Sequence, residues 1–145
     1  MSKTIKQLSV FIENREGRLN EVLGLLGKND VNIVALSLAD TEDFGMLRMI
    51  VSDPEKGREI LKSAEITAKL TEVVAMQVSH ASGSLAKAME KIVDGNINIE
   101  YMYAFANGDA ASVILKSDNP QKVVEILETN GFKVWEADEA YKANQ

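Results

Sequence analysis

The sequence predicts an α+β protein made of two tandem ferredoxin-like units, each with the order β-α-β-β-α-β and an antiparallel sheet. The first observation is an internal repeat, because the segment 8–33 returns 66 positions later as 74–99. The second is that each copy passes from period-two to helical hydrophobic patterning and back in that order. A period this long marks one supersecondary unit used twice, since solenoids need three or more shorter repeats. We therefore expect two domains, at 1–71 and 72–145, each with two helices on one face of a four-stranded sheet.

The first copy contains each expected element in turn. Apolar residues alternate over 6–13, which predicts a half-buried strand. A helix follows, because the next apolar residues have the i, i+3, i+4, i+7 spacing of one buried stripe. These residues are Leu19, Val22, Leu23 and Leu26. Hairpin strands are expected at 31–38 and 46–51, Asp53-Pro54 predicts a capped helix start, and 66–70 predicts the last strand.

The second copy repeats this order. Strands are expected near 73–79, 99–105, 112–116 and 132–136, and helices near 84–93 and 120–129. The first of these helices has the stripe Leu85, Ala88, Met89 and Ile92. Aligning the copies here pairs Asp53 with Asp118 and Pro54 with Pro120. The final segment, 137–145, has no periodicity and is expected to be a frayed tail.

Composition excludes several classes of function. The net charge of −6 argues against nucleic acid as a partner, because phosphate backbones are bound by clustered Lys and Arg. The chain has no cysteine and a single histidine, so disulfides, thiolate chemistry and multi-histidine metal sites are excluded. We expect no cofactor, no metal and no catalytic residues. With no signal-peptide pattern and no run of eighteen apolar residues, a cytoplasmic protein without membrane contact is expected.

A short polar loop with a central glycine joins the first strand to the first helix of each copy. The loops are Asn14-Arg15-Glu16-Gly17-Arg18-Leu19 and His80-Ala81-Ser82-Gly83-Ser84-Leu85. A glycine allows φ > 0 or a close approach to a ligand, and the helix start behind it favours a carboxylate or phosphate. The alternative is a plain turn. Repetition of the loop favours a binding role.

An asparagine opens the second strand of each copy, as Val31-Asn32-Ile33 and Ile97-Asn98-Ile99. Its amide offers donors and an acceptor, which suits the carboxylate and ammonium of an amino acid. The alternative is that Asn simply ends one element and starts the next. Its recurrence at both positions favours function.

Together these loops and asparagines resemble the pattern of the ACT domain family, regulatory modules of ferredoxin-like fold that bind amino acids. The resemblance covers about residues 5–136 and is specifically to a tandem ACT protein without an attached catalytic domain. It implies a ligand pocket between paired domains. The implied ligand-binding residues are Asn14, Arg15, Gly17, Arg18, Leu19, Asn32, Ile33, His80, Ser82, Gly83, Ser84, Leu85, Asn98 and Ile99.

The two implied pockets are chemically unequal. The family's common proline before the glycine is replaced by Glu16 in one copy and Ser82 in the other. Arg15 or Arg18 could clamp a carboxylate, although surface arginines usually solubilise. The second loop is small and open, and His80 either donates to a ligand or is simply solvated. Different affinities are therefore expected.

Three functions are compatible with the sequence. The leading one is a non-catalytic sensor whose free amino acid ligand lies at the interface between the repeats. The second is a regulatory subunit that acts by contact with an amino-acid biosynthetic enzyme. The third is an acylphosphatase-like hydrolase, suggested by the arginine in the first loop and disfavoured by its absence from the second. Exposed sheet edges favour a homodimer in any of these cases.

Overall fold

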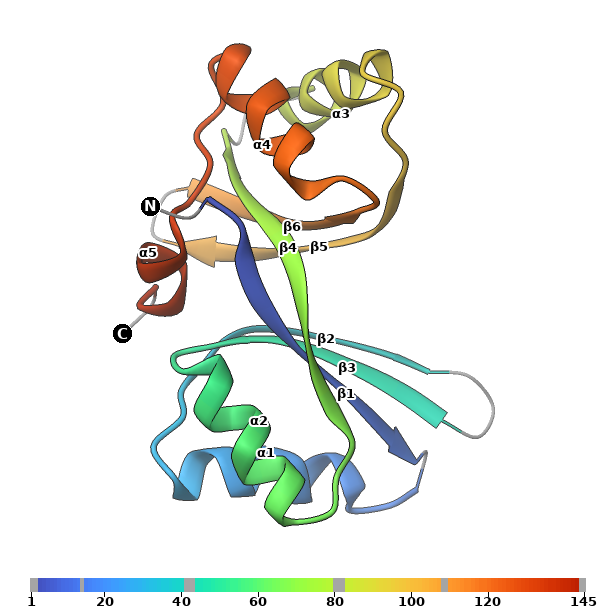
Figure 1. Cartoon of the computed structure of the whole chain (residues 1–145), viewed down its shortest axis with the longest axis vertical. Coiled ribbons are helices and arrows are strands. Elements are labelled where there is room, and N and C mark those ends of the chain that lie inside the picture. The colour runs from blue at the N-terminus through green and yellow to red at the C-terminus, as the bar shows by residue number, and fades with distance from the viewer. Residues whose placement is uncertain (1–2, 14, 41–43, 80–82, 108–109, 144–145) are drawn as a thin grey trace. The chain divides into compact units, whose positions relative to one another are not determined.

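Figure 1 shows a computed structural model of the chain, which describes residues 3–13, 15–40, 44–79, 83–107 and 110–143. The chain divides into two compact units. Residues Lys6–Thr71 form what we call the first-repeat unit, and Glu72–Asn144 together with Met1–Ile5 form the second-repeat unit. None of the helices in the described part of the chain is long and apolar enough to cross a bilayer.

The first-repeat unit has the expected order of elements. They are β1 (Ile5–Glu13), α1 (Arg18–Lys28), β2 (Ile33–Asp40), β3 (Phe44–Val51), α2 (Pro54–Ser63) and the beginning of β4 (Ala68–Val78). The strand order is β2-β3-β1-β4, with β3 antiparallel to both β1 and β2. Asp53 accepts a hydrogen bond from the backbone N–H of Lys56, and Pro54 opens the helix, as the sequence predicts.

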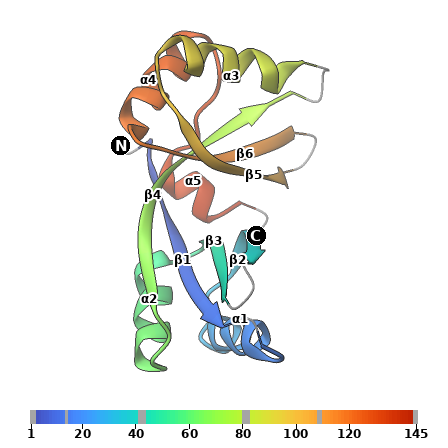
Figure 2. The ribbon, with the colours of Figure 1, turned by 90° about the vertical axis from the view of Figure 1, so that its right-hand side faces the viewer.

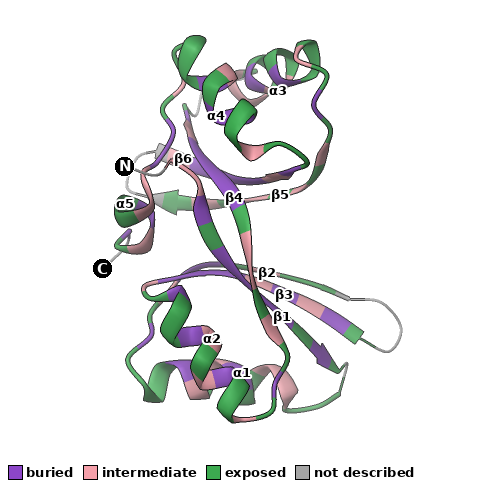
Figure 3. Ribbon diagram, in the orientation of Figure 1, coloured by how far each residue is buried: buried purple, intermediate pink, exposed green. Residues whose placement is uncertain are grey.

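One face of this sheet and the inner stripes of α1 and α2 form the core of the unit. On β1 Leu8, Val10 and Ile12 are buried beneath the helices, but Gln7 and Ser9 on the opposite face are buried as well, so the strand is not the half-buried one that the alternation predicts. The α1 stripe joins the same cluster, with Val22 and Leu26 fully buried and Leu19 and Leu23 packed at its margin. In Figure 3 both helices accordingly carry buried residues on one side and exposed residues on the other. The helical periodicity predicted for α1 is confirmed.

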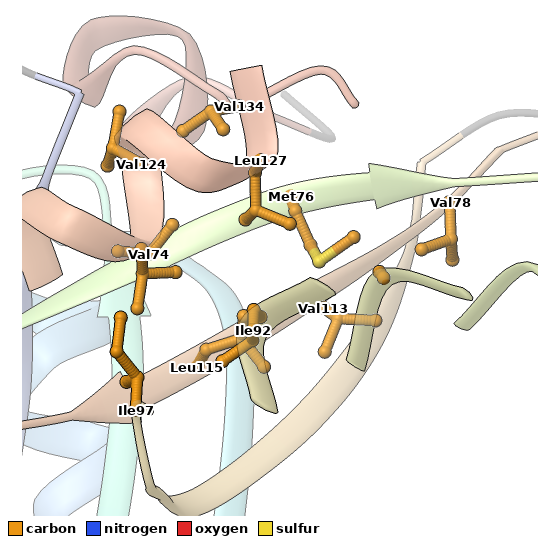
Figure 4. Close-up of a cluster of buried hydrophobic side chains, with 12 residues drawn as sticks. Val74, Met76, Val78, Ile92, Ile97, Val113, Leu115, Val124, Leu127 and Val134 are labelled. Carbon is orange, nitrogen blue, oxygen red and sulfur yellow. The ribbon is translucent and has the colours of Figure 1, made fainter. Parts of the chain in front are cut away.

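The second-repeat unit repeats this architecture. Its elements are the end of β4, α3 (Ser84–Asp94), β5 (Ile99–Asn107), β6 (Ala110–Ser117), α4 (Pro120–Thr129) and the short α5 (Ala137–Tyr141). The strand order is β4-β6-β5, all antiparallel. Figure 4 shows its core, in which Met76 of β4, Ile92 of α3 and Leu127 of α4 are fully buried. Most of these core positions lie 66 residues after core positions of the first-repeat unit.

Three expectations about the second copy require correction. The strands expected at 66–70 and 73–79 are one continuous strand, β4. The strand expected at 132–136 is reduced to an isolated bridge between Val134 and Met76. The helix cap equivalent to Asp53 is Asn119, which accepts from the N–H of Lys122, and not Asp118. Asp and Asn cap helices equally well, so matching Asp53 to the identical residue Asp118 paired the wrong positions of the two copies.

The C-terminal segment is not a frayed tail. Residues 137–141 form α5, which lies on the face of its sheet opposite α3 and α4 (Figure 2). Its start is held by a capping box between Glu136 and Glu139, and Ala140 is 1% exposed. Before it, the Trp135 indole N–H donates to Ser112 Oγ of β6, and Lys3 Nζ donates to the Val134 carbonyl. The segment lacks hydrophobic periodicity because it is only one turn and a half long.

Candidate functional site

The loop glycines of the two repeats adopt the same left-handed conformation. Gly17 has φ of 83° and ψ of −11°, and Gly83 has φ of 84° and ψ of −4°. A Cβ added at either position would meet nothing within 4 Å. Glycine is therefore required here by the left-handed backbone conformation, since there is enough space for a larger side chain. The same backbone turn thus presents the start of the first helix in each unit.

The first helix of each unit differs from the second in how its N-terminus is capped. Neither α1 nor α3 receives a side-chain capping bond from the described residues. In contrast, Asp53 caps α2 and Asn119 caps α4, each at 3.2 Å. The first four N–H groups of a helix lack partners within the helix, so the starts of α1 and α3 retain donors and the positive end of the dipole. These two helix starts suit an anionic group.

The arginines of the first loop are already paired with carboxylates. Arg15 Nε lies 3.0 Å from Glu13 Oε2, and Arg18 Nη1 lies 2.9 Å from Glu21 Oε2. Arg15 is exposed, whereas the Arg18 side chain is only 16% exposed. Its Nε is buried without a hydrogen-bond partner among the described residues. Arg18 is therefore the one of the two that has a buried donor with no acceptor among the described residues.

The second loop is hydroxylic at the equivalent positions. Ser84, which replaces Arg18, shares a 2.5 Å hydrogen bond with Ser79 at the end of β4. Gly83 is exposed. The candidates Asn14, His80 and Ser82 lie outside the described residues. Where described, the two loops thus share a backbone conformation and differ in charge.

Both asparagines present their side chains to solvent. The backbone of Asn32 is held by Ser52, whose Oγ accepts from the Asn32 N–H at 2.9 Å and whose own N–H donates to the Asn32 carbonyl at 2.8 Å. Asn98 is exposed at the equivalent position. Ile33 and Ile99 then begin β2 and β5 and pack against the cores of their units. Each isoleucine thus begins a strand directly after an exposed asparagine.

The loop and the asparagine of one unit lie at opposite ends of its sheet. In the first-repeat unit β3 pairs Val51 with Ile33 at one end and Phe44 with Glu13 at the other. A strand of this length spans about 23 Å at about 3.3 Å per residue. A free amino acid is much shorter than this separation. A ligand of that size therefore cannot contact both the loop and the asparagine of the same unit.

The remaining candidates, Leu19 and Leu85, lie on the core side of α1 and α3. Their packing accounts for their apolar character. The partners of the polar candidates were not anticipated from the sequence. The pair of Arg18 and Glu21 could have been found, because residues i and i+3 are neighbours on a helix. The contact between Asn32 and Ser52 joins residues far apart in sequence and left no local signal.

Comparison with known proteins identifies the family of this fold. A family model described as an ACT domain pair matches residues 3–142. The chain belongs to the ACT domain pair family. The resemblance inferred from the loops and asparagines is thereby confirmed for the fold and for the paired organisation. No curated protein sequence matches the chain.

Solved structures support the assignment to the ACT domain pair family. A protein from Bacteroides thetaiotaomicron is 39% identical, with a TM-score of 0.92 over 97% of this chain and 99% of that one. The ligand-free regulatory subunit of aspartate kinase from Thermus thermophilus is 15% identical, with a TM-score of 0.60 over 87% and 92% of the two chains. A putative C-terminal regulatory domain of aspartate kinase from Porphyromonas gingivalis is 12% identical, with a TM-score of 0.53 over 87% and 92%. These last two share the fold.

Proposed function

We propose that this ACT domain pair is a non-catalytic regulatory protein that binds a free amino acid. The two ACT domains are residues 1–71 and 72–145. The site lies where the glycine loop of one ACT domain meets the asparagine of another. The ligand carboxylate binds the start of α1 or α3, and the asparagine amide binds the other polar end of the ligand.

One observation carries this proposal. In both units the helix after the left-handed glycine has no capping side chain among the described residues, while the second helix of each unit is capped. The sequences of the two repeats differ at most positions, yet the first helix of each begins without a side-chain cap. A bound carboxylate would supply the missing acceptor. The exposed asparagines at the opposite ends of the sheets provide the second half of a two-domain site.

The described loop residues favour unequal sites. A ligand at the start of α1 competes with Glu21 for Arg18, whose side chain is largely buried. A ligand at the start of α3 meets the smaller Ser79 and Ser84 instead. We expect the two sites to differ in affinity, because a carboxylate beside a guanidinium gains charge-assisted hydrogen bonds that a hydroxyl cannot match.

The composition of the second loop disfavours the hydrolase alternative. An acylphosphatase-like mechanism needs an arginine in the loop to hold a phosphate, whereas Ser84 stands in the second loop at the position of Arg18. The regulatory-subunit alternative differs from a self-contained sensor in one respect only, which is stable association with an enzyme. Copurification of the chain with a biosynthetic enzyme would distinguish it.

Calorimetric titration of the full chain with each of the twenty amino acids tests the proposal. We expect one or a few to bind, and Asn32→Ala and Asn98→Ala each to weaken one class of site by about tenfold or more. Glu125→Ala is the control, because Glu125 is an exposed polar residue in the middle of α4, outside the proposed site. No binding by any amino acid, or equal weakening by Glu125→Ala, would refute the proposed site.

A further inference from the structure

A hollow of about 520 Å³ lies within the first-repeat unit, between the last turns of α2 and the start of β4. Figure 1 shows the chain turning from α2 directly into this strand. The lining residues come from 58–62 on α2 and from 65–68 at the turn, and they include none of the described loop residues or asparagines of the proposed site. The volume falls within the range of about 300–1,000 Å³ that is typical of small-molecule sites.

Charged side chains of both signs line this hollow. Arg58, Glu59 and Lys62 come from α2, and Glu65 follows at the turn. Arg58 is already paired, because its guanidinium contacts Glu55 at 2.8 Å and Glu59 at 3.9 Å. The side chains of Lys62 and Glu65 have no partner among the described residues, and they do not pair with each other. One ammonium and one carboxylate therefore line the same hollow with their hydrogen-bonding capacity unused.

The way in which α2 ends explains why these two charges do not meet. The N–H of Ile66 donates to the Leu61 carbonyl and the N–H of Glu65 to the Lys62 carbonyl, which is a Schellman ending. Glu65 itself has a left-handed backbone, with φ of 61°. It thus leaves the helical path, so its side chain is not placed beside Lys62 as an i, i+3 neighbour within a helix would be.

Glutamate is an uncommon residue for this backbone conformation. Asp and Asn adopt it more readily than other residues with a side chain, and Asp30 and Asn96 do so after α1 and α3. After α4, the position 66 residues beyond Glu65 is Gly131, with φ of 82°. The first repeat therefore has a glutamate where its own second copy has the unstrained residue. A residue that is held in an unfavourable conformation points to a function.

The second repeat does not have these charges at the equivalent positions. Val124 corresponds to Arg58 and is part of the core of its unit. Glu128 corresponds to Lys62, and its carboxylate contacts Lys3 at 3.4 Å. The same fold thus forms without an unpaired lysine and glutamate at the end of its second helix. Folding alone therefore does not account for these two residues in the first repeat.

We propose that this hollow binds a small zwitterion, whose carboxylate contacts Lys62 and whose ammonium contacts Glu65. Such a ligand gives a charge-assisted hydrogen bond to each of the two residues at once. A simple anion or a simple cation would leave one of them without a partner. This second site goes beyond the proposed function and does not rest on it, so the two can fail separately.

Calorimetric titration of the full chain with ω-amino acids tests the site. β-Alanine, 4-aminobutyrate and 6-aminohexanoate hold the two charges at increasing separations, whereas acetate and methylamine have one charge each. We expect at least one of the three zwitterions to bind about tenfold or more tightly than either singly charged probe. Binding should persist in Asn32→Ala and in Asn98→Ala. No binding of the three zwitterions, equal binding of acetate or methylamine, or loss in either asparagine variant would overturn the inference.

Charge substitutions test which groups hold the ligand. Lys62→Gln and Glu65→Gln should each weaken binding of the preferred zwitterion by about tenfold or more, because each removes one charge-assisted contact. The exchanged pair, Lys62→Glu with Glu65→Lys, should recover binding, since a zwitterion can bind in the reverse orientation. Glu125→Gln is the control, because Glu125 is the exposed α4 counterpart of Glu59. Unchanged binding in both single variants, equal loss in Glu125→Gln, or no recovery in the exchanged pair would refute the zwitterion site.

Discussion

A Cβ atom on Gly57 would lie 3.0 Å from Cδ2 of Leu8, closer than carbon atoms normally approach. Gly57 faces the core from α2, and Leu8 is fully buried on β1. At the positions 66 residues later the second repeat has Val123 and Val74, both buried. In the first repeat, the space between β1 and α2 is therefore filled by Leu8 alone, because Gly57 has no side chain. In the second repeat, the equivalent space is filled by the two valines. The core volume is shared between strand and helix in two different ways.

This relationship predicts a coupled pair of substitutions. Gly57→Ala should destabilise the chain by about 1 kcal/mol, because a core clash of about 1–3 kcal/mol outweighs the gain of about 1 kcal/mol in helix propensity. Leu8→Val should cost about 1 kcal/mol through lost packing. The double variant should be more stable than the sum of these losses predicts, by about 1–2 kcal/mol. Urea unfolding of the four proteins measures the coupling, and strict additivity would show that the two side chains do not compete.

The loop glycines predict the opposite behaviour from a glycine within α1. Gly17→Ala and Gly83→Ala should each cost about 1–2 kcal/mol, because alanine disfavours the left-handed backbone although space is available. Gly24→Ala is the control, since Gly24 is helical, exposed and equally uncrowded. It should stabilise the chain by about 0.5–1 kcal/mol. Thermal unfolding distinguishes them, and a neutral Gly17→Ala would show that the loop can relax to another conformation.

Elements with a strong period could be predicted from the sequence, and those without one could not. The bounds of the four longer helices, α1 to α4, were expected within a residue or two. Each of these helices has an apolar stripe that packs against the core of its unit. The α5 helix is held by a capping box and by the burial of Ala140, neither of which needs periodicity. Residues 132–136 look like a strand, yet only Val134 pairs in the sheet.

The candidate site was predictable in its residues and not in its contacts. A recurrent glycine before a helix indicates a left-handed turn, as Gly17 and Gly83 confirm. The pairing of Arg15 with Glu13 depends on side-chain conformations beyond the strand end, which local spacing does not determine. The separation of each loop from the asparagine of the same unit follows from strand order alone. It could have been derived by placing Asn32 at the far end of β3.

The buried hydrogen bond from Trp135 to Ser112 predicts that the C-terminal segment contributes to stability. Ser112→Ala should cost about 1–3 kcal/mol, because it leaves the indole N–H buried without an acceptor. Ser117→Ala is a useful comparison, since Ser117 is also buried on β6 but its hydroxyl contacts a backbone N–H at an exposed helix start. Denaturant unfolding followed by fluorescence of the single tryptophan measures the loss. An unchanged midpoint for Ser112→Ala would mean that water replaces the hydroxyl.

The Glu55 carboxylate predicts a defined pH dependence in the acid range. A 2.8 Å hydrogen bond from Lys6 Nζ, followed by the charges of Lys6 and Arg58, holds the pKa of Glu55 below its ordinary value of 4.5. Because the unfolded state then binds the proton more tightly, the contribution of Glu55 to stability is fully present above pH 4.5. It is lost as the pH falls through the lower pKa of the folded state. Glu55 is solvent-exposed, so this contribution should shrink further at high salt.

Replacing the lysine tests this cause directly. Lys6→Met should raise the pKa of Glu55 toward 4.5, because it removes both the hydrogen bond and the nearest positive charge. Lys62→Met, on the same helix α2, is the matched control and should leave the titration unchanged. Carboxyl carbon chemical shifts followed by NMR from neutral to acid pH report the midpoint. An unmoved midpoint in Lys6→Met would assign the lowered pKa to Arg58, whose guanidinium also contacts Glu55 at 2.8 Å.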